Sequence, residues 1–148
     1  MIRAVLDANV FASGVLRYQV PAKTTGATLR AWGTRALELV TCDKLITEIE
    51  RTLSQPYFAT RISNDLRHTL MTALRDDATR TSLSVIVSGV ASHPEDDLVL
   101  SVAVSATVDV LVTGDRQLQK LTSFQGIAIT SPRVFLGSHG EHSKPGSR

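Results

Sequence analysis

Acidic residues occur in this chain where the secondary structure is expected to change. Asp7 follows the short apolar run 2–6, and Asp115 follows the apolar run 108–113. Glu48 lies within an amphipathic segment, and Asp96 lies in the first turn of an expected helix. Two carboxylates about 4 Å apart repel by up to roughly 4 kcal/mol, so acids that meet at one point must bind protons or cations. Divalent cations are the simpler solution.

A site of this kind, with oxygen ligands only, favours Mg²⁺ or Mn²⁺. Cys42 is the only cysteine, so no thiolate cluster is present to hold zinc. Such ions activate a water molecule and stabilise the leaving oxygen of an in-line displacement, and this chemistry hydrolyses phosphodiester bonds. Asn9 would orient a carboxylate or a water through its amide, and Thr113 would donate a hydroxyl beside the metal.

Each acid also has a structural explanation that the sequence leaves open. Asp7 could cap the helix that follows it, and Asp115 could belong to a Thr-Gly-Asp turn. Asp96 and its neighbour Asp97 both suit the positive end of a helix dipole. Glu48 competes with a second glutamate of the same helix, and either could be a surface acid paired with a basic neighbour. Taken singly, none of these residues decides the function.

The elements that must position these residues alternate between strand and helix. Short apolar runs predict five strands, at 2–6, 36–40, 83–87, 108–113 and 126–130. Amphipathic segments between them predict helices, among them 41–53, 62–79 and the one that opens at 92–97. This order predicts an α/β fold with a doubly wound, mostly parallel sheet and helices on both faces. Because carboxyl ends of parallel strands share one edge, Asp7 and Asp115 would meet there if their strands are neighbours.

Local signals predict how two helices begin and where the domain ends. Thr41 or Asp43 is expected to cap the helix that contains Glu48, and Ser92 with Glu95 fits a capping box. Residues 1–136 are expected to form one domain, with 137–148 as a flexible tail rich in Gly, Ser, His and Lys.

The composition is that of an ordinary globular protein, with 43% hydrophobic and 20% charged residues and a net charge of +2. No apolar run approaches the roughly 18 residues of a membrane helix, and the N-terminus lacks the plan of a signal peptide, so a cytoplasmic location is expected. Basic residues without acidic neighbours lie between positions 8 and 37, which favours either a polyanion near Asp7 or a solvated helix face. The candidates for substrate contact are Arg17, Lys23, Arg30 and Arg116.

Four segments, taken in order, resemble the successive motifs of the PIN-domain family. They are Val-Leu-Asp-Ala-Asn-Val-Phe-Ala-Ser-Gly at 5–14, Leu-Ile-Thr-Glu-Ile-Glu-Arg-Thr-Leu at 45–53, Pro-Glu-Asp-Asp-Leu-Val-Leu-Ser-Val-Ala at 94–103 and Val-Thr-Gly-Asp-Arg-Gln-Leu at 112–118. The stretch Ser-Pro-Arg-Val-Phe-Leu at 131–136 resembles the end of a branch described as toxins of toxin–antitoxin systems. The resemblance therefore covers nearly the whole chain to about Leu136.

The resemblance implies a three-layer α/β/α sandwich and a ribonuclease that depends on Mg²⁺ or Mn²⁺. The acidic set of the family maps onto Asp7, Glu48, Asp96 and Asp115, with Asn9 and Thr113 as supporting polar residues. Asp96 is preferred to Asp97 because the family aspartate precedes an apolar residue by three positions and an alanine by seven; Asp97 is kept as an auxiliary ligand. The implied partners are RNA and a cognate antitoxin protein, and a second copy of the chain in a homodimer is a further candidate.

Two other functions remain open from the sequence. One is a PIN-like nuclease that processes RNA or cuts DNA without being a toxin. The other, of a different class, is a catalytically silent or receiver-like α/β signalling module in which Asp7 accepts a phosphoryl group. A receiver is expected to have a lysine after its last strand, whereas 127–134 contains only Arg133.

Overall fold

A mostly parallel sheet forms the centre of the protein, for which a computed structural model describes residues 1–20 and 23–139. Its strands are β1 (Ile2–Leu6), β2 (Leu37–Thr41), β3 (Thr79–Arg80), β4 (Val110–Val112), β5 (Ser123–Phe124) and β6 (Ile127–Thr130). They are ordered β3-β2-β1-β4-β6-β5, and only β5 is antiparallel to its neighbour. The predicted α/β architecture is confirmed. In the described residues the sheet has six strands, rather than the five expected.

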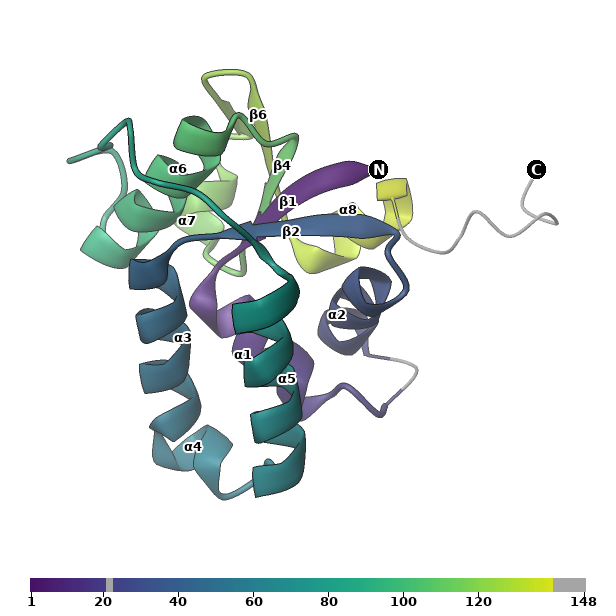
Figure 1. Ribbon diagram of the computed structural model, residues 1–148. Helices are drawn as coiled ribbons and strands as arrows, with labels where there is room; N and C mark the ends of the chain where they lie inside the picture. The colour runs from purple at the N-terminus through teal and green to yellow at the C-terminus, as the bar shows by residue number, and fades with distance from the viewer. Residues whose placement is uncertain (21–22, 140–148) are drawn as a thin grey trace, which may run out of the picture.

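Helices cover both faces of this sheet (Figure 1). They are α1 (Ala8–Leu16), α2 (Thr24–Gly33), α3 (Asp43–Ser54), α4 (Pro56–Ala59), α5 (Asn64–Asp77), α6 (Pro94–Ala106), α7 (Arg116–Gln119) and α8 (Pro132–His139). Helix α6 packs on β1, β2 and β4, whereas α2 packs between α1 and α8 and contacts both. Helices α3 and α5 extend side by side from the sheet, with α4 at their far end (Figure 1).

The central strand β1 is buried from both sides, as its apolar sequence predicts. Ala4 and Val5 are fully buried and Leu6 is 2% exposed. Residue Leu6 pairs with Val112 of β4, so both strands end at the same edge of the sheet. The prediction that these two strands are neighbours is therefore confirmed. The residues that follow each strand lie side by side.

The segment 83–87 does not form the predicted strand. The third strand is instead the two-residue β3, which pairs with the end of β2. The backbone N–H of Val87 donates to Ser101 Oγ at 2.8 Å, and that of Val85 donates to Ser105 Oγ at 3.0 Å. The hydroxyls of these two serines of α6 thus bind the amides of Val85 and Val87, which a neighbouring strand would otherwise bind. The segment runs along α6 as an irregular loop.

The additional strand arises from a hairpin. Gln125 and Gly126 join β5 to β6 with positive φ values of 49° and 85°. Two consecutive residues of positive φ are typical of the tight turns whose twist matches antiparallel strands. Gly126, which the strand prediction assigned to β6, is therefore a turn residue.

Two helix caps differ from the predictions. Helix α3 is capped by Cys42, whose Sγ accepts a hydrogen bond from Leu45 N at 3.4 Å, and not by Thr41 or Asp43. Helix α6 starts after His93, which makes no side-chain cap, so the capping box of Ser92 and Glu95 is not formed. Pro94 takes the first position of that helix, where a missing N–H is tolerated.

The end of the chain is described only in part. Helix α8 continues to His139, three positions beyond the boundary predicted after Leu136. Residues 140–148 of the expected tail lie outside the described residues.

Candidate active site

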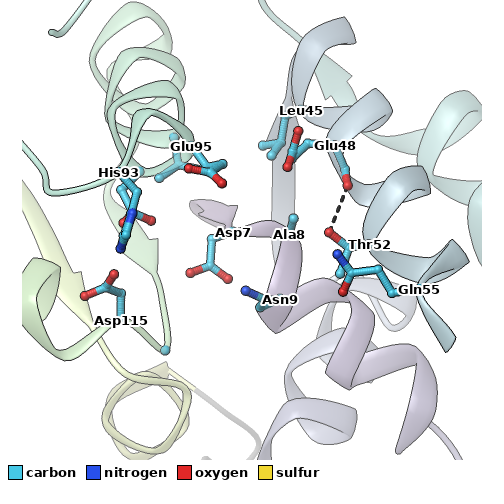
Figure 2. Close-up of a pocket in the computed structure, with 13 residues that line it drawn as sticks. Asp7, Ala8, Asn9, Leu45, Glu48, Thr52, Gln55, His93, Glu95 and Asp115 are labelled. Atoms are coloured by element: carbon cyan, nitrogen blue, oxygen red, sulfur yellow. Dashed lines mark hydrogen bonds between the residues drawn. The ribbon is translucent and has the colours of Figure 1, made fainter. Parts of the chain in front are cut away.

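A pocket of about 440 Å³ lies at the edge of the sheet where β1 and β4 end. All four predicted acids line it: Asp7, Glu48, Asp96 and Asp115. Asp7 enters from the junction of β1 and α1, Glu48 from α3 and Asp115 from the turn after β4 (Figure 2). Asp96 lines the pocket from the first turn of α6. We call this cavity the acidic pocket. Four segments far apart in the sequence are brought together here by the order of the strands.

Asp7 is both a helix cap and a pocket acid, so its two sequence interpretations hold together. Its Oδ1 accepts a hydrogen bond from Val10 N at 2.7 Å, which caps α1. Its Oδ2 accepts one from the hydroxyl of Thr113. Burial raises the pKa of Asp7 above its ordinary value, and the hydrogen bonds from Thr113 and Val10 oppose this shift. The pocket therefore holds an acid whose ionisation is costly without a cation.

Thr113 connects the ends of the two central strands. Its hydroxyl is fully buried, donates to Asp7 and accepts a hydrogen bond from Asp115 N at 3.0 Å. Its carbonyl oxygen accepts from the side-chain amide of Gln119 at 2.7 Å. Thr113 thus fixes Asp7 and the backbone of Asp115 relative to each other.

Asp96 and Asp115 interact as a pair with unequal acidity. Asp115 Oδ1 accepts from the backbone N–H groups of Leu118 and Gln117, and these bonds, the Leu118 one most strongly, lower the pKa of Asp115. Burial, a hydrogen bond to Asp115 and the charges of Asp115 and Asp7 raise the pKa of Asp96 to about 7. The protein thus holds a proton on Asp96 where like charges would otherwise meet.

Glu48 is on the pocket side of α3, and the sequence alternative, Glu50, is not. Leu45, Glu48 and Thr52 follow one another along the face of α3 that lines the acidic pocket, and Gln55 lines it from the end of that helix (Figure 2). Glu48 forms an ion pair of 3.2 Å with Arg51, while Glu50 pairs with Arg75 of α5. Glu50 faces away from the pocket and binds α5, so Glu48 is the glutamate of α3 that belongs to the site.

Asp97 is engaged elsewhere. Its carboxylate accepts three backbone hydrogen bonds, from Gly89 at 2.9 Å, Val90 at 3.2 Å and Ala91 at 2.8 Å. It does not line the acidic pocket. These bonds explain the double acid: Asp96 faces the pocket, and Asp97 fastens the loop that precedes α6.

Four polar residues that line the acidic pocket were not predicted as site residues: His93, Glu95, Thr52 and Gln55. The ring of His93 lies near Asp115 (Figure 2). The available signal was the run Ser-His-Pro-Glu-Asp-Asp, which places His93 and Glu95 in the same turn as Asp96. No local sequence pattern indicates Gln55, because it reaches the site only through the direction in which α3 runs.

The basic candidates for substrate contact do not line the acidic pocket. Arg17 donates to Ser13 Oγ at 3.0 Å, and Arg30 donates to the carbonyl oxygen of Tyr18, so both brace the region between α1 and α2. Lys23 is exposed at the start of α2, and Arg116 is exposed on α7 beside Asp115. Their part in substrate binding stays a prediction.

The acidic pocket fits a divalent cation by its donor chemistry. Its acids offer carboxylate oxygens, which suit Mg²⁺ and Mn²⁺. Burial in the first place, and neighbouring carboxylates in the second, raise the pKa values of Asp7 and Asp96, and a cation would offset this cost of ionisation. Within residues 1–20 and 23–139 no three His, Cys, Asp or Glu side chains are gathered closely enough to enclose an ion as they stand. Binding would therefore draw the side chains inward.

The fold and the acidic pocket together define an α/β protein with carboxylate chemistry at the carboxyl edge of its sheet. A comparison with protein families matches residues 3–117 to the PIN domain. The chain belongs to the PIN-domain family, whose members are in general nucleases, and this supports a phosphodiester hydrolase. A comparison with curated proteins finds no match. In the part of the chain that the structure describes, no helix has both the length and the apolar character needed to cross a membrane.

Proposed function

We propose that the protein is an endoribonuclease that hydrolyses RNA phosphodiester bonds with Mg²⁺ or Mn²⁺. One observation supports this most directly: Asp7, Asp96 and Asp115 line one pocket and raise or lower one another's pKa values. Perturbed carboxylates in a cleft are typical of catalytic sites. Membership of the PIN-domain family supports the same chemistry.

The residues of the pocket divide the work of such a reaction. Asp7, Asp96 and Asp115 would hold the cation, with Glu48 facing them from α3, and a bound ion of this kind supplies activation of water and neutralisation of phosphate charge. Thr113 holds Asp7 in place through its buried hydroxyl. The amide of Asn9 points toward Asp7 and can orient a water or a phosphate oxygen (Figure 2). His93 lies at the other side of the pocket, where it can contact the phosphate.

Cleavage assays test this proposal. Purified protein with Mn²⁺ should cut single-stranded RNA, and Asp7→Asn and Asp115→Asn should lose that activity, whereas Arg133→Ala, an exposed change on α8, should keep it. Equal activity in the wild type and both aspartate variants would indicate a contaminant and overturn the assignment. A single-stranded DNA of the same sequence distinguishes an RNA-specific enzyme from the DNA-cutting alternative.

We further propose that the nuclease is the toxin of a toxin–antitoxin pair that acts on cytoplasmic RNA, with a cognate antitoxin protein as its partner. The support is the likeness of the segment 131–136 to the end of that branch, whereas the segments 5–14, 45–53, 94–103 and 112–118 are similar to the PIN-domain family as a whole. Expression in a bacterial host should arrest growth, and co-expression of a small protein encoded beside it should relieve the arrest. Normal growth with an active nuclease would favour an RNA-processing role. Size-exclusion chromatography with light scattering tests the homodimer.

A receiver-like role for Asp7 has less support, because residues 3–117 match the PIN domain and the segment 127–134 has only Arg133 where a receiver is expected to have a lysine. Calorimetry that found no binding of Mn²⁺ would return this alternative to consideration.

A further inference from the structure

A second hollow, of about 300 Å³, adjoins the acidic pocket on the side of α7. It lies between the loop at 90–92 and α7, and we call it the side groove. The two cavities have two lining residues in common, Asp96 and Asp115. This acid pair is therefore a ridge between two hollows rather than the closed end of one. A strand whose phosphate lay on the acids would extend in both directions, one over the acidic pocket and one over the side groove.

The walls of the side groove are held independently of any ligand. On one side, the carboxylate of Asp97 binds the backbone N–H groups of 89–91. On the other side, Asp115 caps α7, and Gln119 of α7 donates to Thr113 O at 2.7 Å. Because both walls are fixed to the framework of the acids, a ligand in the groove would lose little free energy in ordering them.

The lining of the side groove suits a nucleotide. Its apolar part includes Val90 and Leu121, which are 41% and 39% exposed and so present apolar surface to a base. Its polar part includes Gln117 of α7 and Lys120, which directly follows α7. Lys120 makes no ion pair or side-chain hydrogen bond with the residues that the structure describes. Among the residues that line the two cavities, Lys120 is the only Lys or Arg. A phosphate beside the acids would therefore have this one lining cation to contact.

We propose that the side groove binds the nucleotide adjacent to the scissile phosphate, with Lys120 as the contact for its phosphate and Gln117 as a hydrogen-bond partner. The inference rests on the proposed ribonuclease activity and extends it to a substrate-binding residue directly after α7. Lys120 is a binding residue that acts on the strand beside the reaction, so its removal should weaken binding and leave the chemical step largely intact.

The salt dependence of RNA binding tests this role. The full-length wild type, Lys120→Ala, Lys120→Arg and the control Arg133→Ala are titrated with a fluorescent single-stranded RNA of mixed sequence in chelator, where the strand stays uncut. Each phosphate contact contributes about 0.7 to the slope of log K against log salt for single strands. Lys120→Ala should reduce the slope by about 0.7. Lys120→Arg should restore it, and Arg133→Ala should leave it unchanged, because Arg133 is an equally exposed cation on α8.

Steady-state cleavage with Mn²⁺ supplies a second measurement. Lys120→Ala should raise KM by about five- to tenfold with little change in kcat, as expected when a uniform binding contact is lost. Ser92→Phe, which puts a ring into the groove from its other wall, should raise KM as well. Thermal unfolding of each variant separates these effects from loss of the fold.

The outcomes separate the two proposals. If the wild type cuts RNA but Lys120→Ala and Arg133→Ala have the same salt slope and the same KM, the side groove does not bind the strand. A fall in kcat with unchanged KM would also overturn the inference, since Lys120 would then act on the reaction itself. If the wild type neither binds nor cuts RNA, the proposed function fails and the groove assignment fails with it.

Discussion

Charged residues at the two ends of β1 have opposite surroundings. At its start, Arg3 forms an ion pair of 3.4 Å with Glu38 of β2, and its guanidinium donates to Ala106 O at 2.6 Å. Its backbone N–H donates to Asp109 at 2.8 Å. At the other end of the same strand, Asp7 meets Asp96 and Asp115 as like charges. Charges that are paired stabilise the sheet, and those that are crowded destabilise the free protein.

Whether a charged side chain has a partner of opposite charge distinguishes structural from functional residues more clearly than its burial does. Glu38 and Asp109 have partners of opposite charge or polarity and their places are explained by the fold alone. Asp7 caps α1 and binds Thr113, but an asparagine caps a helix about as well, so the cap does not need the charge whose burial raises the pKa of Asp7. The pKa of Asp96 is likewise raised, by burial and by its acidic neighbours. Acids whose charge the fold tolerates rather than needs are the candidates for function.

The largest expected effect comes from Asp7→Asn. It should lower RNA cleavage by at least about a hundredfold, as loss of a charged catalytic group does. It should also raise the Tm of the metal-free protein at neutral pH, because a buried carboxylate becomes a neutral amide. The measurements are cleavage rate and thermal unfolding in chelator. The same substitution at the other end of the sheet, Asp109→Asn, is the control and should keep activity; a lower Tm for Asp7→Asn would contradict the comparison.

Adjacent acids on α6 should show the next largest difference. Asp97→Ala should lower the free energy of unfolding by about 1–3 kcal/mol, because three backbone N–H groups lose a charged acceptor. Asp96→Ala should leave the unfolding free energy unchanged or higher while it removes activity. Urea unfolding in chelator measures both. Equal destabilisation by the two variants would show that Asp96 is a structural acid.

Arg3→Met should have a smaller effect and only on stability. The ion pair with Glu38 is about one-third exposed, and such pairs contribute roughly 0.2–1 kcal/mol. The lost hydrogen bond to Ala106 O adds a similar amount, so about 1 kcal/mol is expected in total. Urea unfolding measures the loss, and the cleavage rate should not change. A large loss of cleavage would mean that the two ends of β1 are coupled.

The pH dependence of stability tests the raised pKa of Asp96 directly. The pKa of Asp96 is raised to about 7 in the folded protein, above its value in the unfolded chain. The folded state therefore favours protonated Asp96, and this contribution to stability is lost as the pH rises toward and through about 7. Without metal, Asp96→Asn should gain stability over the wild type as the pH rises from about 5 to about 8. Unfolding curves at both pH values test this, and a gap that narrows toward high pH would contradict it.

Metal affinity should change in the opposite sense with pH. A proton on Asp96 must leave before its carboxylate can bind an ion, so the affinity for Mn²⁺ should increase as the pH rises toward and beyond about 7. Calorimetric titration at several pH values measures this affinity. An affinity that stayed constant between about pH 5 and pH 8 would contradict the raised pKa of Asp96.

The sequence predicts the acid edge well because its signals are local and strong. Apolar runs before Asp7 and Asp115 identify two buried strands, and parallel order places their ends together. The irregular segment 83–87 could not be predicted, because its amides are satisfied by Ser101 and Ser105, which appear in the sequence only as polar positions of a helix. The Cys42 cap likewise depends on a thiol in a position that usually takes oxygen.

The side of a helix that faces the site could also not be predicted from the sequence. Glu48 and Glu50 are two positions apart, and only the position of Arg75 on α5 shows that Glu50 has a structural role. The hairpin strand β5 has two residues, which is too short for any periodicity to reveal.

The hydrogen bond between Thr113 and Asp7 joins residues 106 positions apart. For the ribonuclease proposed above, its consequence concerns the moment during synthesis at which the chain gains its activity. During translation, Asp7, Glu48 and Asp96 emerge from the ribosome before the strand that carries Thr113 and Asp115. Because contacts of such sequence separation form late, a growing chain has no complete acid set until that strand has joined the sheet. The messenger that encodes the nuclease would thus be shielded from its own product for most of each round of synthesis.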